Sequence, residues 1–254
     1  MFDTHLHLDD EAFDLDRDDV VARALAAGVG GLLTVGTGLE SSRAAVMLAG
    51  RLPQVWAAVG IHPHAAPEAI AETMATLGDL AASPGVVAIG ESGLDYARDY
   101  APREAQHDAF RRHIRLSLDL DLPLVVHNRE AHGDVLEILA REGARRVIMH
   151  CFSGSPDMAR LCVARGYYVS LAGPVTYRNA RRLLEVATAV SLDRLLLETD
   201  APYLPPEPFR GRRNEPAHLV HTARRVADVR GITLEELAAA TTASARAALG
   251  LGRP

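Results

Sequence analysis

Eight short apolar runs alternate with longer amphipathic stretches, and this alternation limits the possible folds more than any other feature of the chain. The runs cover residues 2–8, 31–37, 55–61, 86–91, 124–127, 146–151, 167–171 and 195–200. Two of them, VIMH and LLLETD, stay apolar until their last residues, as parallel strands covered on both faces do. The runs therefore predict eight buried parallel strands.

The stretches between the runs have helical periodicity. In residues 102–121, apolar side chains recur at Phe110, Ile114 and Leu118 with arginines between them, which is the pattern of an amphipathic helix. Pro123 ends this helix just before the next run. Strand and helix repeated eight times predict an α/β fold, a single (β/α)₈ TIM-type barrel.

The chain has 254 residues, and one such barrel typically needs roughly 250. No low-complexity linker or internal repeat interrupts it, so we expect one domain over residues 1–254. Residues 216–251 are rich in Ala and Leu and predict two closing helices, interrupted near residues 231–233. A doubly wound open sheet is the competing architecture, but no G-x-G-x-x-G follows an early run.

Composition excludes several kinds of chemistry. All 27 basic residues are arginine, which excludes a Walker A loop, a Schiff-base enzyme and a metal pair bridged by a carboxylated lysine. Cys151 and Cys162 form no C-x-x-C pair, which argues against a Cys-ligated zinc and suits a reducing compartment. The segment MFDTHLHLDD lacks signal-peptide features, and no run of 18 apolar residues occurs. We expect a cytoplasmic location and no membrane span.

Histidines and carboxylates gather at the ends of the predicted strands. His5 and His7 form an H-x-H, and the period of two along a strand turns both imidazoles to the same side. The other candidates end later runs and are Glu91, His127, His150 and Asp200. Because barrel enzymes place catalytic groups at the carboxyl ends of their strands, we expect all six in one pocket.

Burying these six groups is costly unless something compensates their charges. Two carboxylates and four imidazoles suffice for two divalent ions about 3.5–4 Å apart if one carboxylate bridges them. The predicted ligands are His5, His7 and Asp200 for one ion and His127 and His150 for the other, with Glu91 bridging both. Asp200 is also the candidate catalytic base. The alternative is an ion-pair network without metal.

The native metal is left open by this ligand set. We expect Mg²⁺ or Mn²⁺, but imidazole and carboxylate ligands also accept Zn²⁺, Ni²⁺ or Fe²⁺.

Seven segments, in order between residue 2 and about residue 216, carry a resemblance to a known family. They are the H-x-H at 5–7, GIHPH at 60–64, GESGLDY at 90–96, VHNREA at 126–131, HCFSGS at 150–155, GPVTYRNA at 173–180 and LLLETDAPYLPP…RGRRNEP at 195–216. The chain thereby resembles the TatD family of metal-dependent deoxyribonucleases. The resemblance implies a barrel of the metallo-dependent hydrolase type, two divalent ions and hydrolysis of DNA phosphodiester bonds.

The resemblance also implies roles for single residues. The family's metal ligands fall on the same six residues chosen above, and its substrate-binding positions fall on His62 and Arg129. Two departures from the family pattern are visible. Ser92 stands where an aliphatic residue is usual, and Arg212 stands where lysine is expected. Neither touches a proposed ligand, and Arg212 keeps a positive charge.

The net charge of −6 is unlike that of a protein that wraps duplex DNA. Local arginines can still hold phosphate. Arg129 follows the fifth run, and Arg210, Arg212 and Arg213 follow the eighth. We therefore expect a DNA substrate that is single-stranded or held at its ends. We also expect the protein to be a monomer.

Two other functions compete with this interpretation. A small-molecule amidohydrolase or lactonase would use the same metal centre on a carbonyl group. Arginines near the strand ends favour phosphate over that substrate. A non-catalytic binding module is the second alternative, and a missing ligand would have supported it, but all six are present.

Overall fold

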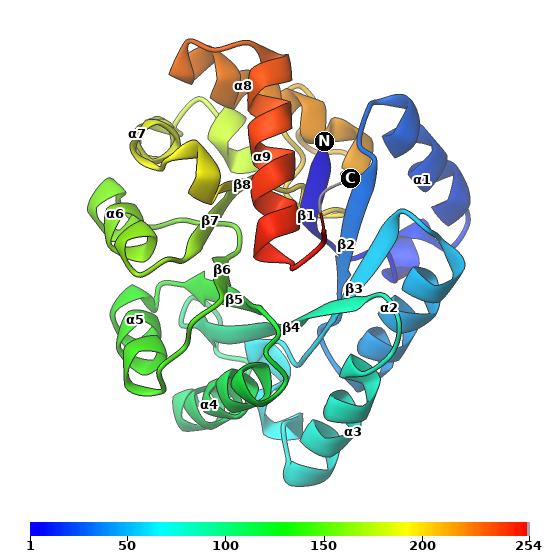
Figure 1. Cartoon of the computed structure of the whole chain (residues 1–254), viewed down its shortest axis with the longest axis vertical. Helices are drawn as coiled ribbons and strands as arrows, with labels where there is room; N and C mark the ends of the chain where they lie inside the picture. The colour runs from blue at the N-terminus through cyan, green and yellow to red at the C-terminus, as the bar shows by residue number, and fades with distance from the viewer. Residues whose placement is uncertain (253–254) are drawn as a thin grey trace. The chain divides into compact units, whose positions relative to one another are not determined.

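The computed structural model describes residues 1–252 and contains an eight-stranded sheet (Figure 1). The strand order in the sheet is the order of the chain, from β1 to β8. The strands are β1 (Phe2–Leu6), β2 (Gly31–Val35), β3 (Val55–Val59), β4 (Val86–Asp95), β5 (Leu124–Arg129), β6 (Val147–Met149), β7 (Tyr168–Leu171) and β8 (Leu195–Leu197). This confirms the predicted (β/α)₈ TIM-type fold.

Each of the first seven strands is followed by one α-helix, and β8 is followed by two. The helices are α1 (Arg17–Ala26), α2 (Leu39–Arg51), α3 (Ala71–Ala81), α4 (Arg103–Asp119), α5 (His132–Arg141), α6 (Pro156–Ala164), α7 (Arg181–Ala189), α8 (Leu219–Arg230) and α9 (Leu234–Ala248). Short 3₁₀ helices are η1 (Glu11–Phe13), η2 (Pro63–Glu68), η3 (Gly173–Thr176), η4 (Leu192–Arg194) and η5 (Pro216–His218).

The two closing helices predicted for the carboxyl-terminal part are present. Gly231 ends α8 in the left-handed region with φ of 66°, a conformation that favours glycine. Thr233 then begins α9, because its side chain and that of Glu236 form a capping box. The predicted interruption at residues 231–233 is confirmed. Within the described residues, none of the helices combines the length and apolar character needed to cross a lipid bilayer.

Strand ends differ from the prediction at several functional positions. β1 ends at Leu6 and β6 at Met149, one residue before His7 and His150 respectively, and β5 continues past His127 to Arg129. β4 does not end at Glu91 but continues through the next four residues, as far as Asp95. β8 ends at Leu197, so Asp200 lies in the loop after it. The prediction that every candidate ligand ends a strand is therefore wrong for Glu91 and His127, because the pairing of β4 with β5 continues past both residues to Asp95 and Arg129.

The chain folds into two compact units. The first unit comprises Met1–Leu33 and Cys151–Pro254, and the second comprises Thr34–His150. The chain passes from the first unit to the second within β2 and returns directly after β6. The expectation of one domain over residues 1–254 stays a prediction, and its last two residues lie outside the described part.

The predicted amphipathic helix illustrates how a sequence pattern becomes packing in the second unit. Phe110 and Ile114 of α4 are fully buried, whereas Arg112 lies on the exposed face and pairs with Asp108 at 2.9 Å. The apolar stripe thus faces the interior and stabilises the unit by burying nonpolar area.

Candidate metal centre

His5, His7 and Asp200 form a cluster in the first unit, called the first cluster below. One ligand atom from each lies within 4.8 Å of the others. Oδ1 of Asp200 is 3.4 Å from Nε2 of His7 and 3.8 Å from Nε2 of His5. His5 is fully buried and Asp200 is slightly exposed, so the carboxylate can meet both a buried ion and solvent.

Backbone hydrogen bonds hold the loop that carries Asp200 against β1. The Asp200 N–H donates to the carbonyl of His5 at 2.9 Å, and the His7 N–H donates to the carbonyl of Ala201 at 2.7 Å. Asp200 has φ of 57°, a conformation that Asp tolerates better than most residues. The side chain of buried Asn214 donates to the carbonyl of Thr199 at 2.9 Å. These bonds bring Asp200 beside the H-x-H although β8 has already ended.

Three histidines surround Glu91 in the second unit, and together these four residues are called the second cluster. Oε1 of Glu91 is 2.7 Å from Nδ1 of His127, 3.2 Å from Nε2 of His150 and 3.7 Å from Nε2 of His62. The Glu91 side chain is only 2% exposed. A buried carboxylate oxygen with three imidazole nitrogens around it is a donor set that suits a divalent cation.

An irregularity in β4 places Glu91 beside β5. Ile89 pairs with Leu124 but Ser92 pairs with Val126, so β4 holds one extra residue between these pairs. Gly93 then lies opposite His127 with φ of 150°, and a Cβ there would be 2.0 Å from the His127 carbonyl oxygen. Only glycine permits that approach of the two backbones.

Asp95 is a buried carboxylate of the candidate site that the sequence reasoning missed. Its Oδ2 accepts a hydrogen bond from Nε2 of His64 at 2.8 Å and lies 3.3 Å from Nε2 of His127. Burial alone raises the pKa of Asp95, but the bonds from His127 and His64 outweigh it and hold the pKa well below its usual range. The available signal was the strand period of two, which puts Glu91 and Asp95 on the same side of β4.

His127 thus stands between two carboxylates, those of Glu91 and Asp95. Burial by itself lowers the pKa of His127, whereas the bonds to both carboxylates raise it, and the net shift is upward. Two negative charges around one imidazole attract a positive charge to this place. A cation that took the proton's position would meet the same attraction.

Glu198 is a second buried carboxylate that the sequence reasoning did not single out. Its side chain is fully buried, and Oε1 accepts a hydrogen bond from the Cys151 N–H at 2.8 Å. It precedes Asp200 by two positions in LLLETD, so the acidic character at the end of that run was the signal.

The two predicted substrate-binding residues lie in different surroundings. His62 belongs to the second cluster, because its Nε2 lies 3.7 Å from Oε1 of Glu91. Its other ring nitrogen, Nδ1, accepts a hydrogen bond from the His64 N–H at 3.1 Å, which orients the ring. Arg129 is exposed at the end of β5. The structure thus gathers His62 with predicted metal ligands and leaves Arg129 open to solvent.

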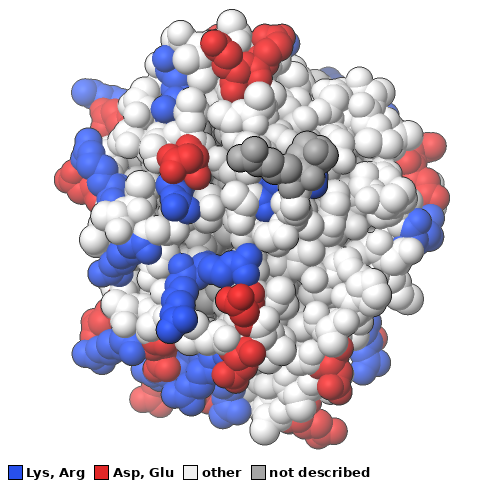
Figure 2. Space-filling view, viewed as in Figure 1, with Lys and Arg blue, Asp and Glu red and all other residues white. Residues whose placement is uncertain are grey.

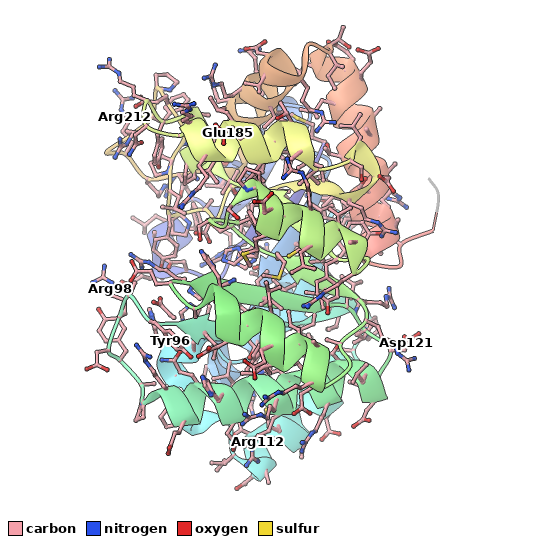
Figure 3. The ribbon with its side chains drawn as sticks, turned by 90° about the vertical axis from the view of Figure 1, so that its left-hand side faces the viewer. Tyr96, Arg98, Arg112, Asp121, Glu185 and Arg212 are labelled. Atoms are coloured by element: carbon pink, nitrogen blue, oxygen red, sulfur yellow. The ribbon has the colours of Figure 1, made fainter. Side chains whose placement is uncertain are left out.

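The arginines after β8 separate into two kinds. Arg213 donates hydrogen bonds to Asp16 at 2.8 Å and to Glu215 at 2.8 Å. Its guanidinium group is therefore engaged by carboxylates, and the prediction that it holds phosphate is wrong. Arg210 lies over the ring of Tyr177 at 4.2 Å. On the face drawn in Figure 2, arginines and acidic side chains are interspersed. Arg212 is exposed, and its side chain extends away from the ribbon in Figure 3.

Comparison with known proteins gives the family of this chain. The family model described as TatD related DNase matches residues 2–250. The chain belongs to the TatD family. It is therefore similar throughout its length to metal-dependent hydrolases, and it is one itself.

Two curated relatives and one solved structure illustrate the similarity to TatD proteins. The "Uncharacterized metal-dependent hydrolase YabD" of Bacillus subtilis is 42% identical over 97% of both chains. The "3'-5' ssDNA/RNA exonuclease TatD" of Escherichia fergusonii is 40% identical over 99% of both. The crystal structure of YJJV, a TatD homologue from Escherichia coli, superposes with a TM-score of 0.94 at 30% identity, covering 99% of this chain and 98% of that one.

The residues present fit the divalent metal that TatD hydrolases depend on. Each cluster combines at least two imidazoles with one carboxylate. Candidate ligand atoms lie within 4.8 Å of one another among His5, His7 and Asp200 and among His62, Glu91 and His127, and Nε2 of His150 lies 3.2 Å from Glu91. Burial of these groups without a compensating cation is costly. The structure brings His5, His7 and Asp200 together and brings Glu91, His127, His150 and His62 together. That all of them surround one pair of ions stays a prediction.

Proposed function

We propose that the chain hydrolyses DNA phosphodiester bonds with two divalent ions, acting on single-stranded DNA or on strand ends. The observation that carries this proposal is the pair of clusters, each with imidazoles around a carboxylate. The name of the Escherichia fergusonii relative, an ssDNA/RNA exonuclease, favours a nucleic-acid substrate.

The proposed ligands follow from the two clusters. His5, His7 and Asp200 would hold one ion, His127 and His150 the other, and Glu91 would bridge them. A pair of bound divalent ions supplies positive charge to the scissile phosphate and lowers the pKa of water. Asp95 fixes the orientation of the His127 ring by its position at 3.3 Å from Nε2.

Asp200 is the proposed general base. Its Oδ1 lies among the imidazoles of the first cluster, and its side chain is 14% exposed, so an attacking water can reach it. The carboxylate accepts the proton of that water as the water oxygen bonds to phosphorus, and the bond from phosphorus to the ester oxygen of the leaving nucleotide breaks.

Phosphate recognition falls to arginines outside the clusters. Arg129, Arg210 and Arg212 are exposed, and guanidinium groups bind phosphate oxygens in pairs of hydrogen bonds. Few such contacts are available, so we infer a grip on a strand end rather than on long duplex DNA. The cytoplasmic location and the monomeric state remain parts of the proposal.

End-labelled oligonucleotides provide the test. We expect the protein with Mg²⁺ or Mn²⁺ to shorten single-stranded DNA faster than duplex DNA, with an RNA strand assayed beside them. Asp200→Asn should lower turnover by about 10²–10⁴-fold without changing the circular dichroism spectrum. Intact DNA with every metal tried, together with cleavage of a lactone or an amide, would instead support the amidohydrolase alternative.

A further inference from the structure

Tyr203 is an exposed aromatic residue directly beside the first cluster. The residue is 53% exposed, although it lies in the same loop as Asp200. Its ring centroid is 5.8 Å from that of His7, with the ring planes at 63°. One side of the ring therefore contacts a proposed ligand while a large part of it meets solvent.

The exposed ring is held at several points. Its hydroxyl donates to Oδ2 of Asp10 at 2.7 Å, and Oδ1 of Asp10 is itself fixed by the Ala12 N–H at 2.8 Å. The Tyr203 N–H donates to the Asp200 carbonyl at 2.8 Å, and the Asn214 side chain donates to the Tyr203 carbonyl at 2.7 Å. An aromatic ring fixed in this way loses little conformational entropy when something stacks on it.

We propose that Tyr203 binds the substrate by stacking on a nucleobase next to the bond that is cleaved, and that Asp10 is the positioning residue for its ring. The inference rests on the proposed function. Every base offers a π-face, so an aromatic platform binds single strands without sequence preference. Paired bases inside a duplex are not open to such a platform, which agrees with the proposed preference for a strand end or a single strand.

The proposal is independent of the arginines, because they contact phosphate and Tyr203 contacts a base. A matched pair of oligonucleotides separates the two effects. One is an ordinary single-stranded DNA, and the other has abasic sites at its terminal nucleotides with the phosphates unchanged. Loss of the base should raise KM for the wild-type protein by about tenfold.

Substitutions at Tyr203 complete the test. Tyr203→Ala should raise KM for the ordinary strand by about tenfold, change kcat less than threefold, and abolish the difference between ordinary and abasic strands. Tyr203→Phe keeps the ring but loses the bond to Asp10, so KM should rise by about threefold, as in Asp10→Ala. Leu25→Ala alters another exposed apolar residue of the same unit and serves as the control.

Two results would overturn the stacking proposal while leaving the proposed function intact. One is an unchanged KM in Tyr203→Ala, and the other is an equal rise for ordinary and abasic strands. Failure of the wild-type protein to cleave any oligonucleotide would remove the proposed function and the stacking role together. If Tyr203→Ala does not fold by circular dichroism, Tyr203→Leu keeps the bulk, lacks the π-face and gives the same comparison.

Discussion

Oε1 of Glu91 lies 2.7 Å from Nδ1 of His127, while Asp95 on the same strand lies 3.3 Å from the other ring nitrogen. β4 therefore contributes a carboxylate to each nitrogen of one imidazole. Such pairing fixes the ring orientation before any ligand binds. A shift of the β4 backbone would therefore move both carboxylates and change the orientation of the His127 ring.

Metal stoichiometry tests the bridging role proposed for Glu91. We expect two ions per chain in the wild-type protein, one in His7→Ala, and fewer than one in Glu91→Gln, because a bridging ligand serves both ions. Atomic emission of gently purified protein measures this. Glu137→Gln on the exposed surface of α5 is the control. Retention of one full ion by Glu91→Gln would show that the carboxylate serves a single ion.

Asp95→Asn should weaken metal binding without removing a proposed ligand. The amide cannot supply the charge that orients His127 and His64, and loss of such outer partners typically costs about 10–100-fold in affinity or activity. Competition with a chelator of known affinity measures the change. An affinity equal to that of the wild-type protein would contradict the orienting role of Asp95.

Salt dependence tests the arginines after β8. Arg210→Ala and Arg212→Ala should each raise KM for single-stranded DNA and reduce the slope of log KM against log salt by about 0.7, the value for one phosphate contact on a single strand. Arg181 pairs with Glu185 on α7 at 3.3 Å, so Arg181→Ala should keep the wild-type slope. Equal slopes in all variants would place the phosphate contacts elsewhere.

His113 should make the stability of the fold depend on pH. Its Nε2 accepts from the Ile61 N–H at 3.0 Å, and burial lowers its pKa to about 4 from the ordinary 6.5. The unfolded chain then binds a proton between pH 6.5 and 4 that the folded chain does not. Stability from this residue is complete above pH 6.5 and falls by about 3 kcal/mol as the pH drops to 4.

Comparison with His113→Gln isolates this contribution, because glutamine can keep a hydrogen bond but does not titrate. Urea unfolding at several pH values should show a smaller loss of stability toward pH 4 in the variant. Parallel curves for the two proteins between pH 7 and 4 would mean that His113 is not held neutral in the fold.

Ser92→Ala should stabilise the protein. Ser92 is 1% exposed, and its hydroxyl has no hydrogen-bond partner within residues 1–252. Removing a buried unsatisfied hydroxyl gains about 1 kcal/mol, or about 2–4 °C in Tm for a chain of this size. Differential scanning calorimetry measures the shift, and a lower Tm would show that the hydroxyl is satisfied in solution.

The fold could be predicted from the sequence because buried parallel strands leave an unmistakable pattern of apolar runs. The strand ends could not, since backbone pairing is indifferent to the polarity that ends a run. β4 shows this most clearly, because its hydrogen bonds to β5 continue past Glu91 through Ser92 and Gly93 to Asp95.

The candidate ligands could be selected from the sequence, but the residues that support them could not. Histidines and acids at run ends were visible, and the structure places them around two carboxylates, Asp200 and Glu91. The pairing of Arg213 with Asp16 was not visible, because the two residues are distant in the sequence. The pairing of His64 with Asp95 was missed for the same reason. His64 lies in η2 and Asp95 lies at the end of β4, so the two residues are also distant in the sequence.

The division of the chain has a consequence for its synthesis. The second unit is a continuous segment, Thr34–His150, whereas the first is assembled from both ends of the chain. A ribosome adds roughly 5–20 residues per second, so the amino-terminal H-x-H waits roughly 6–23 s while residues 34–150 are made. During that time β8 has not been made, and the residues of β1, which are all buried in the folded protein, remain exposed. We expect nascent β1 to be a binding site for a chaperone.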